Sequence, residues 1–120
     1  MKCTCGREVK DHPAEPCLDR LYMILVMQWS DTKIDQMRWA KGCDFHPSTN
    51  IGDAMEGMEE YHKNRIDITW YPIIGGGTWL VKIREKGNLY LGEAKGIKAL
   101  GLAITRTLIL WAGMKRFYRK

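Results

Sequence analysis

Four residues that can bind metal occur within the first seventeen positions: Cys3, Cys5, His12 and Cys17. Zinc prefers thiolate and imidazole ligands, and four of them complete a tetrahedral site. The same segment is rich in turn-forming residues and has almost no apolar side chains with which to fold itself. Metal binding can supply the missing folding free energy, on the order of 10 kcal/mol. The spacing therefore predicts a zinc knuckle in this segment.

A closed set of four protein ligands leaves no open coordination position, so we expect this zinc to be structural. Cys43 and His46 form a Cys-x-x-His pair that could replace His12 or Cys17 as ligands. The other interpretation is that these cysteines are free thiols. Disulfides between them are not expected in a reducing cytosol. A catalytic role for Cys43 and His46 would need the two side chains to face each other, which their spacing in irregular chain does not provide. We therefore expect a protein that is not an enzyme.

The 120-residue chain carries a net charge of +5, distributed unevenly. Residues 1–60 have 7 Lys and Arg against 11 Asp and Glu, whereas residues 61–120 have 12 against 3. A basic half can attract nucleic acid or an acidic protein surface. The candidate nucleic-acid contacts are Lys95, Lys98, Arg106, Lys115 and Arg116. The candidate protein contacts are the acidic residues Glu56, Glu59 and Glu60.

Hydrophobic periodicity predicts the elements that must position these residues. Apolar residues recur at helical spacing in three segments, numbered 16–30, 47–64 and 95–114. Apolar and polar residues alternate in three others, numbered 65–71, 79–84 and 89–93, which predicts strands. Short glycine-containing links between these strands require antiparallel pairing. Residues 31–47 show no clear period, and we expect at most a short strand at 37–39.

The predicted fold class is therefore α+β. We expect a three-stranded antiparallel meander sandwiched by about three helices, with an N-terminal zinc knuckle. The chain is expected to be one globular unit, with the knuckle at 1–17, the main domain at 18–114 and a basic tail at 115–120. No apolar run is long enough to cross a bilayer, and the start of the chain lacks a signal-peptide core, so we expect a cytoplasmic protein without a membrane partner.

Three segments in this order resemble the phage ABA-sandwich domain family, and the likeness covers roughly residues 17–112. They are LDRLYMILVMQW at 18–29, PSTNIGDAM at 47–55 and GEAKGIKALGLAITR at 92–106, with a glycine-turn hairpin before the last. The resemblance implies an α/β/α arrangement around an antiparallel sheet, a phage origin and no catalytic residues. It also implies that the CTCG…HPAEPC lead-in is a zinc-knuckle extension.

The resemblance adds a functional expectation, which is inhibition of host defence by direct binding. Some anti-CRISPR proteins are similar in size and kind, and zinc-bearing ones bind Cas9. We therefore expect a host effector such as Cas9 as the partner, with the acidic residues of segment 47–64 facing its basic surface. The alternative is a nucleic-acid-binding phage accessory protein that uses the basic residues named above.

Overall fold

The computed structural model describes residues 1–41, 45–60, 65–85 and 87–118, without the side chains of 37–41, 59–60, 65, 74 and 115–118. The helices are α1 (Pro16–Leu25), α2 (Asp31–Lys41), α3 (Ile51–Glu60) and α4 (Leu100–Tyr118), with short 3-10 turns η1 (Val9–Asp11) and η2 (Ile74–Gly76). The strands are β1 (Arg65–Tyr71), β2 (Thr78–Glu85) and β3 (Asn88–Lys95).

The three strands form one antiparallel sheet in the order β1-β2-β3, as predicted. Trp70 pairs with Trp79 across the first hairpin, and their ring centroids lie 4.9 Å apart. Gly77 has φ 118°, a conformation that favours glycine, and a Cβ there would lie 2.3 Å from the Trp70 ring. The glycine turn therefore closes the hairpin and leaves room for the paired indoles.

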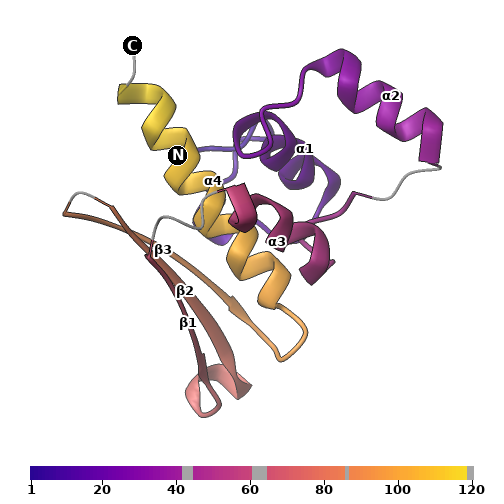
Figure 1. Ribbon diagram of the computed structural model, residues 1–120. Helices are drawn as coiled ribbons and strands as arrows, with labels where there is room; N and C mark the ends of the chain where they lie inside the picture. The colour runs from indigo at the N-terminus through magenta and orange to yellow at the C-terminus, as the bar shows by residue number, and fades with distance from the viewer. Residues whose placement is uncertain (42–44, 61–64, 86, 119–120) are drawn as a thin grey trace.

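All described helices lie on one side of the sheet, with α4 packed against β2 and β3 (Figure 1). The core between these layers includes Val81, Ile83, Leu108 and Trp111, each at most 1 % exposed. The α+β class and the three-stranded antiparallel meander are thus confirmed. In the described residues the fold has two layers, whereas the family resemblance implies helices on both faces of the sheet.

The prediction for residues 31–47 was wrong in its first half, because α2 covers Asp31–Lys41, including the expected strand at 37–39. Ser30, which we expected to close the preceding helix, accepts a hydrogen bond from the Lys33 N–H through its Oγ at 3.1 Å. It therefore caps the start of α2. The predicted period was missing because Ile34 is the only residue of 31–36 that is buried. One buried apolar residue in this part of the helix gives no periodic signal.

The boundary between the last strand and the last helix also differs from the prediction. β3 continues to Lys95, which pairs with Thr78, and α4 begins only at Leu100. Between them, Gly96 has φ 104° and donates its N–H to the Gly77 carbonyl at 2.9 Å. This turn replaces what we expected to be the first turn of the helix. None of the helices in the described part of the chain is long and apolar enough to cross a membrane.

Candidate metal centre

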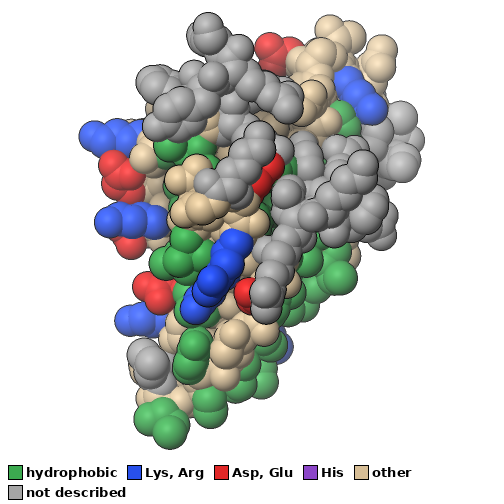
Figure 2. Space-filling view, turned by 60° about the vertical axis from the view of Figure 1, so that its left-hand side comes forward, with side chains coloured by type: hydrophobic (Ala, Val, Ile, Leu, Met, Phe, Trp, Pro, Cys, Tyr) green, Lys and Arg blue, Asp and Glu red, His purple; other side chains and the backbone are tan. Residues whose placement is uncertain are grey.

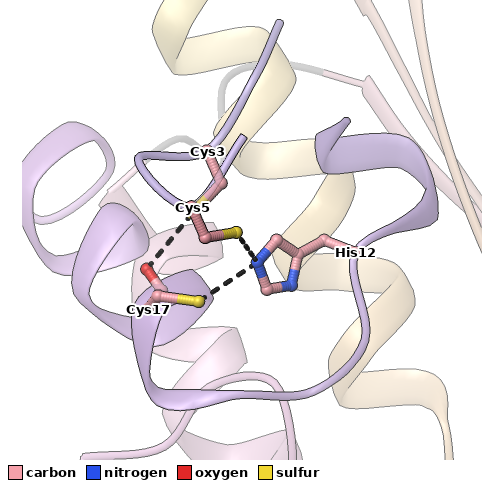
Figure 3. Close-up of side chains that lie close together, drawn as sticks. All are labelled: Cys3, Cys5, His12 and Cys17. Carbon is pink, nitrogen blue, oxygen red and sulfur yellow. Dashed lines mark hydrogen bonds between the residues drawn. The ribbon is translucent and has the colours of Figure 1, made fainter. Parts of the chain in front are cut away.

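The four residues predicted as zinc ligands meet at one point. One ligand atom from each of Cys3, Cys5, His12 and Cys17 lies within 4.8 Å of all the others. The Sγ atoms of Cys5 and Cys17 are each 3.1 Å from His12 Nε2, and the three side chains converge in Figure 3. Three sulfur atoms and one imidazole nitrogen are a donor set that zinc binds in structural sites. The cluster can therefore hold a metal ion.

A tight turn places the first two thiols. The Cys3 N–H donates to the Arg7 carbonyl at 2.9 Å, and the Gly6 N–H donates to the Cys3 carbonyl at 2.9 Å. Gly6 has φ 90°, which a side chain would disfavour. The third thiol, of Cys17, stands in the first turn of α1 directly after Pro16. Proline suits that position because its missing N–H would have had no partner within the helix.

His12 is fixed by a hydrogen bond through its other ring nitrogen. Its Nδ1 lies 2.7 Å from the Pro13 carbonyl oxygen, and because that oxygen can only accept, Nδ1 carries the hydrogen. Nε2 then presents a lone pair toward the sulfur atoms. Histidine ligands of metals commonly donate their second N–H in this way. The residue is completely buried, so the ring cannot turn toward solvent.

The backbone of His12 is held by Arg106 of α4. The Arg106 guanidinium donates to the His12 carbonyl oxygen from Nε at 3.0 Å and from Nη2 at 2.6 Å. Its Nη1 donates to the Glu93 carbonyl oxygen on β3. Burial lowers the pKa of Arg106 from its ordinary value. These internal bonds give Arg106 a structural role, which differs from the nucleic-acid contact that we predicted.

The thiols differ in their ease of ionisation. The pKa of Cys5 is lowered to about 7, chiefly because a hydrogen bond from the Arg7 backbone N–H stabilises its thiolate. Burial raises the pKa of Cys17 to about 11, and the neighbouring thiols add to that rise. Cys3 is buried, whereas Cys5 is exposed. One edge of the cluster is thus open to solvent, and Cys5, whose pKa is lower than that of Cys17, lies at that edge.

His46, one of the two alternative ligands, does not join this cluster in the described part of the chain. His46 Nδ1 lies 3.4 Å from Asp19 Oδ2, and the His46 N–H donates to Asp53 Oδ2 at 3.0 Å. Cys43 lies outside the described residues. Sequence reasoning missed Asp19, which is only 4 % exposed and also accepts a hydrogen bond from the Ser48 N–H at 2.8 Å. In the sequence, Asp19 is only an acidic residue beside a predicted apolar stripe. Nothing there indicated that its carboxylate would bind His46 and Ser48.

The predicted surface contacts are described only in part. Glu56 is exposed on α3, and Lys95 and Lys98 are exposed around the end of β3. The side chains of Glu59, Glu60, Lys115 and Arg116 lie outside the described residues.

Comparisons of the chain with protein-family models, with curated proteins and with solved structures found no match.

Proposed function

We propose that this chain is a non-catalytic binding module that contains one structural zinc ion. The observation that carries the proposal is the convergence of three thiols and one imidazole within 4.8 Å. Such a set fills the tetrahedral shell of zinc with protein atoms, which is typical of sites that support folding. A metal used in this way leaves the outer surface of the domain to make functional contacts.

We further propose that the module inhibits a host-defence effector such as Cas9 by binding it directly. Support comes from the family resemblance and from the mixed surface chemistry. Figure 2, in which the sheet side of the molecule comes forward, shows basic and acidic side chains interspersed with apolar ones. A non-obligate protein interface is about as apolar as the rest of a protein surface, with polar groups around its rim, so a mixed surface of this kind is compatible with one.

Two surfaces are candidates for this contact. On the outer face of the sheet, Leu89 and Leu91 are 48 % and 44 % exposed, and they pair with Arg84 and Lys82 of β2. On α3, the exposed Glu56 can approach a basic, nucleic-acid-binding surface of a nuclease. The sheet face offers apolar area as well as charge, so we favour it as the centre of the contact.

The test measures DNA binding and DNA cleavage by guide-loaded Cas9 in the presence of excess protein. We expect both activities to fall. Leu91→Glu should abolish the effect if the sheet face makes the contact, and Glu56→Lys should do so if α3 makes it. Thermal melting of each variant checks that the fold is retained. Unchanged Cas9 activity with the unmodified protein would contradict the Cas9 proposal.

The alternative is nucleic-acid binding through Lys95 and Lys98, supported by their exposure near the start of α4. It predicts a gel shift that weakens as salt concentration rises, because phosphate contacts release counterions. Protein binding without such a shift would exclude this alternative. A shift that disappears in Lys95→Ala and Lys98→Ala, with no effect on Cas9, would favour it.

A further inference from the structure

The turn between β1 and β2 carries the most exposed large apolar side chain among the described residues, which is Ile73 at 91 %. The stretch 70–79, which closes this hairpin, contains no charged residue. Surface turns more often use glycine, proline and small polar residues. A single exposed apolar residue is ordinary, but several at one end of a molecule mark a site of contact with a protein or a membrane.

A second exposed isoleucine lies at the same end of the sheet. Ile97 directly follows the turn after β3 and is 70 % exposed, and its carbonyl accepts a hydrogen bond from Trp79 Nε1 at 3.0 Å. The Gly96 N–H donates to the Gly77 carbonyl, so the connection from β3 to α4 is fastened to the hairpin turn. Figure 2 shows hydrophobic side chains along the lower end of the molecule, where this turn lies in Figure 1. We call Ile73 and Ile97 the apolar tip.

The charged residues beside the apolar tip are basic. Lys95 ends β3, and a Cβ built at Gly75 in the turn would lie 3.8 Å from its Nζ. Lys98 directly follows Ile97 and is exposed. Neither lysine forms an ion pair with a carboxylate in the described part of the chain. The nearest acidic residue of β3, Glu93, lies two ladder pairs further from the turn, about 7 Å along the strand.

We propose that the apolar tip inserts into the surface of an anionic membrane. Lys95 and Lys98 attract the negative headgroups, while Ile73 and Ile97 enter the layer beneath them. The insertion is shallow, because the peptide groups of the glycine turn need polar partners and must stay at the level of the headgroups. A lipid surface suits the tip better than a protein pocket does, because two isoleucines on separate loops need no matching cavities in lipid.

This mode of binding needs no membrane-spanning helix. It therefore differs from the sequence-based expectation that the chain has no membrane partner, which considered only spanning segments and signal peptides. It also goes beyond the proposed inhibition of a host effector, because neither Leu91 nor Glu56 belongs to the apolar tip.

Co-sedimentation of the full chain with vesicles of two compositions tests the proposal. One set contains phosphatidylcholine alone, and the other contains phosphatidylcholine and phosphatidylglycerol in equal amounts. We expect binding to the anionic vesicles and much weaker binding to the neutral ones. Ile73→Glu should weaken binding about tenfold or more, because it removes an inserted apolar side chain and adds a negative charge. Lys95→Ala should weaken it about fivefold.

Two control variants show whether the effect belongs to the tip. Leu89→Glu makes the same kind of change at the opposite end of the sheet, where Leu89 is 48 % exposed, and Lys10→Ala removes an exposed lysine of η1. Both should bind anionic vesicles like the unmodified protein, and thermal melting checks that every variant keeps its fold.

Three results would overturn the proposal. The first is no binding to anionic vesicles, or equal binding to neutral ones. The second is an equal loss of binding in Leu89→Glu, which would place the contact elsewhere. The third is vesicle binding that Ile73→Glu leaves unchanged, and if this variant lost binding to an effector protein instead, the tip would be a protein contact.

Discussion

The carbonyl oxygen of His12 accepts two hydrogen bonds from the guanidinium of Arg106, a residue 94 positions later in the chain. The metal cluster is therefore not an independent appendage. One of its ligands is held in place by α4, and the same guanidinium also bonds to the Glu93 carbonyl of β3. The Arg106 side chain therefore connects the metal cluster, α4 and the edge strand β3.

Replacement of Arg106 by lysine should therefore loosen both the domain and the metal site. A lysine cannot make the forked contact, and each hydrogen bond to a charged group contributes about 1.5–3 kcal/mol. We expect a loss of stability of about that size in thermal denaturation, together with weaker zinc binding in competition with a chromophoric chelator. Arg20→Lys is the control, because the exposed Arg20–Asp31 pair should contribute less than about 1 kcal/mol. Equal effects of the two substitutions would contradict this view.

Purified protein should contain about one zinc ion per chain, and a strong chelator should lower its thermal stability. Cys3→Ser and Cys17→Ser should each reduce the zinc content measured by elemental analysis, because each removes one of four ligands. Cys43→Ser is the matched control and should retain the metal. Loss of zinc in Cys43→Ser, with retention in Cys17→Ser, would assign the fourth ligand to the alternative that the sequence left open.

Zinc affinity should rise with pH, since each thiol must lose its proton to bind the metal. In the metal-free protein the pKa of Cys17 is raised to about 11, so its proton is displaced on binding throughout the neutral range. Displacement of this one proton raises the zinc affinity about tenfold for each unit by which the pH rises. The pKa of Cys5 is about 7, so below that pH Cys5 must also lose a proton on binding, and the zinc affinity should change more steeply with pH there. Competition titrations from acid to alkaline pH measure the slope, and a flat profile would refute thiolate ligation.

Gly57 should not tolerate alanine. The Tyr22 hydroxyl donates to the Ala54 carbonyl at 2.6 Å and accepts from the Gly57 N–H at 3.0 Å, which joins α1 to α3. A Cβ at Gly57 would lie 2.2 Å from the Tyr22 hydroxyl oxygen and 2.7 Å from Val26 Cγ1. Overpacking of this kind costs about 1–3 kcal/mol, which exceeds the gain in helix propensity of about 1 kcal/mol.

A double-mutant cycle with Tyr22→Phe checks the cause of this loss. Removing the hydroxyl takes away the closest clash, so Gly57→Ala should cost less stability in the Tyr22→Phe background than in the unmodified protein. Chemical denaturation of the four proteins gives the coupling energy. Additive effects would mean that the hydroxyl does not cause the strain at Gly57.

Sequence reasoning located the metal cluster because its ligands are close in the chain and have few other uses in such a polar segment. The sheet was predictable because apolar residues alternate along each strand and glycine turns connect the strands. The helix α2 was missed because Ile34 is the only buried residue of 31–36, and a single buried residue produces no helical period. The contact between Arg106 and His12 could not be found, because no local pattern links a helical arginine to a distant carbonyl oxygen.

The position of the metal ligands has a consequence for how the protein is made. All four candidate ligands lie within residues 3–17, so a metal ion can be captured before the later segments are synthesised. The helix that holds the His12 carbonyl follows every other described helix and strand in the sequence. His12 therefore gains its two bonds from Arg106 only after α4 has been synthesised, and until then the metal knuckle lacks this attachment to the rest of the fold.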